Sequence, residues 1–165
     1  AINEKTLTAE MPKRSACLQD QSSRLDKAMD AYDDALQIRK MQLGDHVSVA
    51  KTMHNKGNIR HRQRRYDEAL NCYSDALRIR EVKLGLDHLD VAYTLENIGM
   101  IYSESSNKLE DPEKALAHLE RVLLIRKHHL PNDDVSVADA LFLIGSVYES
   151  TGNDFKATKC LDEAL

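Results

Sequence analysis

Histidines are the side chains of this sequence best suited to bind a metal ion or move a proton. The chain has seven of them, but it contains neither a His-Glu-x-x-His motif nor a Glu-x-x-His pair of the di-iron type. His128 and His129 are adjacent, so on a helix they are not expected to share one face. The sequence also lacks a Walker-type loop and a Gly-x-Ser-x-Gly turn. We therefore predict no catalytic residue, no metal site and no cofactor, and we expect that the protein is not an enzyme.

Arginines form the densest charged segment, which is the run Arg60-His-Arg-Gln-Arg-Arg65. One interpretation is a basic patch for an acidic partner segment, a phosphate group or RNA. The alternative, which we favour, is a solvated helix end, because cations stabilise the C-terminus of a helix. The residues assigned to this patch are Arg60, Arg62, Arg64 and Arg65. The net charge of the whole chain is −4, which argues against a general nucleic-acid binder.

The composition limits the elements that can position these side chains. Six glycines and three prolines in 165 residues are too few for the turns of a β-sandwich, and 42% apolar residues argue against disorder. No apolar run approaches the roughly 18 residues of a membrane span. Cys17, Cys72 and Cys160 are widely spaced and suggest no disulfide framework. We predict a mostly helical cytoplasmic protein, with an organelle after removal of a presequence as the open alternative.

An internal repeat organises the chain. Val47-Ser-Val-Ala50 returns 42 residues later as Leu89-Asp-Val-Ala92, and 46 residues after that as Val135-Ser-Val-Ala138. Each unit predicts two helices, because its apolar residues recur at helical spacing. The first helix of each unit is expected to begin at Ser48, Asp90 or Ser136, which are good N-cap residue types. The predicted helices are 26–43, 48–64, 67–84, 90–104, 112–129, 136–150 and 155–165, after a degenerate N-terminal segment, 1–25, that holds the remains of a first helix.

Three glycines at one constant offset predict how the paired helices touch. Gly57, Gly99 and Gly145 lie within helices, where each costs about 1 kcal/mol relative to alanine. A repeated cost is explained by close approach of the second helix, whose matching residues are Ala69, Ala115 and Ala157. The sequence therefore predicts an all-α fold, a right-handed superhelical solenoid of antiparallel helix pairs with about 3.5 repeats.

At this point the sequence resembles the tetratricopeptide repeat family, over about residues 26–165. The 42-residue period is similar to the long repeats of kinesin light chains and related scaffolds. The heptad coiled coil through which a motor light chain joins its heavy chain is absent. The third unit also departs from the pattern, with Pro131-Asn-Asp-Asp134 in place of the Gly-x-Asp-His connection. The residues that carry the resemblance are Tyr66-Asp-Glu-Ala-Leu70, Ala76-Leu-Arg-Ile-Arg-Glu81, Leu84-Gly-Leu-Asp-His88, Asp90-Val-Ala92 and Asn97.

The resemblance implies that the first helices line a concave groove that holds a peptide or a partner helix. Asn55 and Asn97 match the family's peptide-binding asparagine, whose amide both donates and accepts hydrogen bonds. The expected binding residues are Lys51, His54, Asn55, Asn58, Arg62, Tyr93, Glu96, Asn97, Met100 and Phe142, with His61, Ser103, Glu104, Asp139, Ser146, Glu149 and Ser150 beside them. The groove would be polarised, because its early end is basic and its later end is acidic. The alternative is that these residues are solvated helix faces.

Two cations of the first complete repeat need a separate explanation. Lys56 lies where the later repeats have Ile98 and Ile144, and Arg60 lies where they have Tyr102 and Tyr148. A cation at a packing position should be paired or should extend to water. We predict ion pairs with the acidic segment that precedes this repeat, which contains Asp26, Asp30, Asp33 and Asp34.

We therefore expect a non-catalytic scaffold or adaptor that binds a protein partner in its groove. One alternative is a structural subunit of a larger complex that uses its convex face or its edges. Another is a regulatory repeat domain of a longer protein, because the sequence stops at Leu165 inside a predicted helix.

Overall fold

The computed structural model describes residues 4–104 and 109–164, with side chains from residue 23 onward. These residues form helices and connections and contain no β-strand, which confirms the predicted all-α class. No helix among them is long and apolar enough to cross a lipid bilayer. The helices are α1 (Glu4–Leu43), α2 (Val47–Arg62), α3 (Tyr66–Leu84), α4 (Leu89–Ser103), α5 (Pro112–His129), α6 (Val135–Ser150) and α7 (Asp154–Glu163).

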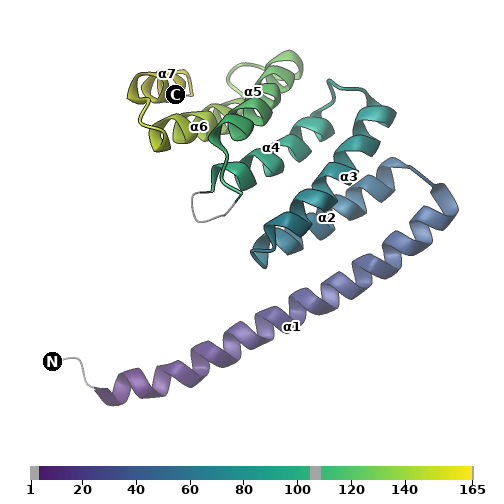
Figure 1. The fold of residues 1–165 in the computed structure, drawn as a ribbon, viewed down its shortest axis with the longest axis vertical. Helices are drawn as coiled ribbons and strands as arrows, with labels where there is room; N and C mark the ends of the chain where they lie inside the picture. The colour runs from purple at the N-terminus through teal and green to yellow at the C-terminus, as the bar shows by residue number, and fades with distance from the viewer. Residues whose placement is uncertain (1–3, 105–108, 165) are drawn as a thin grey trace.

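The helices stack in chain order as antiparallel pairs (Figure 1). The pairs α2–α3, α4–α5 and α6–α7 have the most extensive contacts, and each pair then packs on the next through α3–α4 and α5–α6. The buried side chains form successive clusters between pairs instead of one central core. One such cluster joins Leu95 of α4 and Ile125 of α5 to Ala140 of α6. This layered core confirms the predicted solenoid.

Histidine and aspartate side chains cap the first helices of the units. Nδ1 of His46 accepts a hydrogen bond from the Ser48 amide (3.1 Å), and Nδ1 of His88 accepts one from the Asp90 amide (3.0 Å). Asp134 caps α6 in the same way, through the Ser136 amide (2.8 Å). The expectation that Ser48, Asp90 and Ser136 are the N-caps was wrong by two residues. These residues instead supply the amides that the caps satisfy.

The repeated glycines lie at close helix contacts, as predicted, but side chains make the tightest of these contacts. A Cβ atom added to Gly57 would lie 2.6 Å from the Tyr73 ring, and one added to Gly99 would lie 2.8 Å from Leu119. At Gly145 the nearest atoms, from Leu161, would be 3.4 Å away. The expected alanines contribute only backbone, through the carbonyl oxygens of Ala115 and Ala157 at 3.4 and 3.5 Å.

The first unit differs from the others because α1 is one continuous helix from Glu4 to Leu43. A separate first helix was expected within residues 1–25, but residues 4–25 belong to α1 instead. Its N-terminal half runs clear of the other helices in Figure 1. No other described helix covers α1 as α2 covers α3. Ile38 is therefore 55% exposed, whereas its repeat equivalent Ile79 is 1% exposed.

Candidate functional site

The first helices of the units, α2, α4 and α6, carry the residues predicted to bind a partner. Helices α4 and α6 contact each other directly across the unit boundary, so the first helices gather on one side of the solenoid. Three large apolar side chains of this side are exposed, namely Tyr93 (47%), Met100 (37%) and Phe142 (58%). Lys51 and Asp139 are also exposed. The predicted residues thus lie on the first helices of successive units, although their environments differ.

A cleft of about 330 Å³ lies between α1 and α2. Three predicted binding residues, Asn55, Asn58 and Arg62, line its α2 wall. The opposite wall is the uncovered face of α1, formed by Leu25, Ala28 and Tyr32. The Tyr73 hydroxyl donates a hydrogen bond to Oδ1 of Asn58 (2.7 Å), which fixes the orientation of that amide. The cleft therefore has a polar wall with at least one oriented amide and an apolar wall.

His54 is buried and is not a surface residue of the predicted groove. Only 1% of it is exposed, because its ring stacks on Tyr93 (4.5 Å between ring centroids) and also packs against Tyr73 (5.1 Å). Burial, together with the nearby Arg80 charge, lowers the pKa of His54 to about 4. The imidazole is therefore neutral at pH 7 and adds no positive charge to the early end of the groove.

Glu96 also adds no unpaired negative charge to the predicted groove. Its carboxylate accepts a hydrogen bond from Nη1 of Arg126 (2.7 Å), and both side chains are nearly buried. Asn97 donates from Nδ2 to the carbonyl oxygen of Tyr93 in its own helix (2.9 Å). The exposed charged residues on this side of the solenoid are thus Lys51 and Arg62 at the basic early end and Asp139 and Glu149 at the acidic later end.

The basic run is partly neutralised. Lys56 forms an ion pair with Asp33 of α1, as predicted. The prediction for Arg60 was wrong, because its Nε lies 3.0 Å from the carboxylate of Glu68 on α3. Arg65 also pairs with Glu68, so one carboxylate serves two of the four arginines assigned to the patch. Arg62 and Arg64 remain exposed. The turn that follows α2 forces Arg64 into the left-handed backbone region (φ 58°).

Sequence reasoning missed the repeated arginine at the end of each second helix. Arg39 donates to Thr52, and Arg80 donates to Thr94 (2.5 Å) and to the Asp90 carbonyl oxygen (3.0 Å). Arg126 makes the equivalent bond to the Ser136 carbonyl oxygen (2.8 Å). Each arginine therefore joins one unit to the first helix of the next. The repeated Leu-x-Ile-Arg sequence was the available signal, but a local pattern does not show which helix the arginine reaches.

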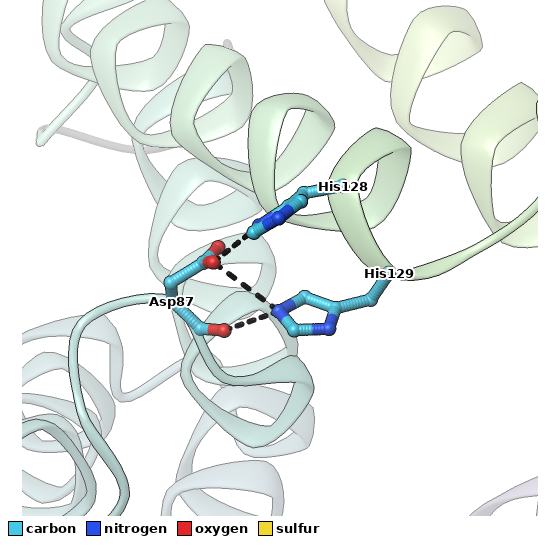
Figure 2. Close-up of side chains that lie close together, drawn as sticks. All are labelled: Asp87, His128 and His129. Atoms are coloured by element: carbon cyan, nitrogen blue, oxygen red, sulfur yellow. Dashed lines mark hydrogen bonds and ion pairs between the residues drawn. The ribbon is translucent and has the colours of Figure 1, made fainter.

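A second missed feature is a cluster of Asp87, His128 and His129, shown in Figure 2. Nδ1 of His128 lies 2.5 Å from Oδ2 of Asp87, and Nε2 of His129 lies 3.3 Å from the same atom. Adjacent histidines were not expected to share one helix face, yet both of these rings reach one aspartate of a neighbouring connection. His129 is the last residue of α5, and Asp87 lies in the α3–α4 connection beside that helix end, where both rings reach it.

Comparison with known proteins agrees with this architecture. The tetratricopeptide repeat profile matches residues 7–81 and 48–110, which together cover more than half of the chain. The structure is similar to that of BtubC (BKLC) from P. vanneervenii, with a TM-score of 0.77 and 28% identity over 90% of this chain and 58% of that one. It also resembles a putative kinesin light chain with nearly identical TPR-like repeats from Podosopora anserina, with a TM-score of 0.68. That likeness has 16% identity, covers 87% of this chain and 66% of the other, and supports the fold alone.

No curated protein matches the chain by sequence. The chain spans less than two thirds of the length of BtubC. The profile match, the paired helices and their order agree with one another. The chain belongs to the tetratricopeptide repeat family, whose repeats generally mediate protein–protein interactions.

Proposed function

We propose that this protein is a non-catalytic interaction module that binds a partner helix in the α1–α2 cleft and along the adjoining first helices. The observation that carries the proposal is the cleft itself. It joins three predicted binding residues of α2 to an apolar face of α1 that no other described helix covers.

The repeat indicates what kind of segment fits this cleft. Ala28, Tyr32 and Ala35 of α1 correspond to Ala69, Tyr73 and Ala76 of α3, which are fully buried under α2 and its neighbours. On α1 the same three side chains are only partly buried. Helix α2 approaches α3 with a glycine against the Tyr73 ring. A partner helix with a small residue opposite Tyr32 would reproduce that contact.

The exposed side chains of the first helices supply further contacts. Tyr93, Met100 and Phe142 are large apolar residues at the surface, and residues of this type often contribute strongly to protein interfaces. Lys51 and Arg62 near the cleft favour acidic residues of the partner, and Asp139 and Glu149 favour basic ones at the other end. We infer that the partner is an amphipathic helix with an acidic segment at the cleft.

Site-specific photo-crosslinking tests this proposal. Benzoylphenylalanine is placed at position 32, 100 or 142 of the full chain in cells, with positions 82 and 124 as controls. Val82 and Leu124 are equally apolar and are 73% and 70% exposed, but they lie on the second helices. We expect one partner segment to crosslink from positions 32 and 100, at sites spaced three, four or seven residues apart as on a helix.

Other crosslink patterns would contradict the proposal. Crosslinks mainly from positions 82 and 124 would support the structural-subunit alternative, with binding through the second helices. Crosslinks from position 32 only to residues 7–22 of the same protein would show that its own N-terminal segment fills the cleft. Replacing Tyr93 and Phe142 by alanine should weaken partner capture, whereas the matched variant Val82→Ala should not.

A further inference from the structure

We propose that Asp87, His128 and His129 form a binding site for a divalent transition-metal ion such as Zn²⁺. The site lies between the α3–α4 connection and the end of α5, and it includes none of the residues of the proposed partner site.

Three donor atoms of the right chemical types converge there. Two imidazole nitrogens and one carboxylate oxygen lie within 4.8 Å of one another. This combination of ligands suits zinc and its neighbours in the first transition series better than Ca²⁺ or Mg²⁺, which prefer oxygen ligands. Figure 2 shows both rings directed at Asp87, and all three residues are exposed to solvent.

The spacing requires little rearrangement to accept an ion. Zinc binds nitrogen and oxygen ligands at about 2.0–2.1 Å, so tetrahedral ligands lie roughly 3.3 Å apart. His129 Nε2 and Asp87 Oδ2 are already 3.3 Å apart. The His128 Nδ1 to Asp87 Oδ2 distance of 2.5 Å must widen, and the exposed His128 side chain is free to rotate. Water would complete the coordination.

The connection that carries Asp87 is held in place by the protein. Arg121 of α5 donates to the carbonyl oxygen of Leu86 (3.1 Å) and pairs with Glu81 of α3 (2.8 Å). Nε2 of His129 lies 2.5 Å from the carbonyl oxygen of Asp87, and His129 would have to give up this hydrogen bond to bind an ion through Nε2.

A bound ion would have a structural consequence. It would tie the connection that follows the α2–α3 pair to the second helix of the α4–α5 pair. Because an ion that binds only the folded state stabilises it, the site would strengthen the stacking of these two units.

Calorimetric titration with ZnCl₂ tests the site. The full chain is used with Cys17, Cys72 and Cys160 replaced by serine, so that thiolates do not compete for the metal. We expect one Zn²⁺ to bind per chain and to raise the melting temperature, and MgCl₂ to give no binding. His128→Ala, His129→Ala and Asp87→Asn should each weaken Zn²⁺ binding about tenfold or more, because even the loss of an outer-shell partner of a metal ligand costs at least that much.

The matched control is His61→Ala, because His61 lies outside the cluster and also faces a carboxylate, Glu104, at 3.6 Å. Its Zn²⁺ affinity should equal that of the parent. The proposal fails if the three cluster variants bind Zn²⁺ as tightly as the parent, or if all histidine variants weaken binding equally, which indicates general adsorption. Circular dichroism verifies the fold of each variant. If His128→Ala has lost helix, His128→Gln replaces it.

Discussion

Equivalent arginines, Arg80 and Arg126, lie at two unit boundaries of this solenoid, but their surroundings differ. At the boundary between α3 and α4, Arg80 donates hydrogen bonds to Thr94 and to the Asp90 carbonyl oxygen. Nδ1 of the His54 imidazole lies 3.5 Å from Nη1 of Arg80. At the boundary between α5 and α6, Arg126 bonds to the Ser136 carbonyl oxygen and to the carboxylate of Glu96. His54 and Glu96 occupy the same position of their repeats.

The repeat thus places an arginine at both boundaries. The residue at position 54 or 96 determines whether the charge of that arginine is balanced. Arg126 has a carboxylate partner that balances its charge. Arg80 has neutral oxygen acceptors, and burial lowers its pKa from the ordinary value. His54 beside it stays neutral, since a second positive charge in that buried space would be unfavourable. The two boundaries should therefore respond differently to mutation and to pH.

Loss of the Glu96 carboxylate should have the largest effect. Glu96→Gln leaves the Arg126 charge nearly buried without its counterion, and we expect the free energy of unfolding to fall by about 2–3 kcal/mol. Urea denaturation measures this loss. The matched control is Glu81→Gln, which breaks the more exposed pair with Arg121 and should cost less than about 1 kcal/mol. Equal losses in the two variants would show that burial does not strengthen the Glu96 pair.

Acidification should weaken the α3–α4 boundary first. The pKa of His54 is about 4 in the folded protein and 6.5 ordinarily, so between these values only the unfolded chain takes up the proton. The free energy of unfolding should therefore fall as the pH falls, by about 2 kcal/mol between pH 7 and pH 5.

The variant His54→Gln tests the source of this pH dependence, because glutamine does not titrate. Urea denaturation at pH 7 and pH 5 should show a clearly smaller loss in this variant than in the parent. Burial also lowers the pKa of His118, so that residue contributes in the same direction and His118→Gln is the matched control. An unchanged pH dependence in His54→Gln would rule out His54 as its main source.

Replacing the repeated glycines by alanine compares the helix contacts within two different units. Gly57→Ala places a methyl group against the Tyr73 ring and should destabilise the protein by about 1–2 kcal/mol. Gly145→Ala meets ordinary contact distances from Leu161, so the gain in helix propensity should leave it neutral or up to about 1 kcal/mol more stable. Thermal and urea denaturation of both variants measure the difference, and similar destabilisation in both would contradict this explanation.

The helix caps should give the smallest effects. His88→Ala removes the side-chain acceptor for the Asp90 amide and should cost about 0.5–1 kcal/mol. His88→Asp, which reproduces the residue type found at Asp134, should retain the stability of the parent. Denaturant titration distinguishes the two variants. If both lose stability equally, the role of His88 lies outside capping.

Most of the fold could be predicted from local spacing, whereas much of the candidate site could not. The repeat of Gly57, Gly99 and Gly145 located the helix contacts, although the atoms that crowd each glycine come from Tyr73 or its leucine equivalents. Lys56 was correctly paired with the acidic segment of α1 because its position lies among apolar ones. His54 and Glu96 were correctly placed on first helices, but their burial depends on Tyr93 and Arg126, which belong to a neighbouring unit or a paired helix.

The sequence by itself determined the helical class, the repeat period, the paired helices and the family resemblance, because these follow from the order and spacing of residue types along one chain. The tertiary structure decided that α1 is continuous, that His46 and His88 cap helices, that Glu96 is paired and His54 neutral, and that Asp87 meets two histidines about forty residues away. The physical reason is that burial, pKa and ligand geometry depend on which side chains face one another across the stacked units. Spacing along the chain does not specify those partners.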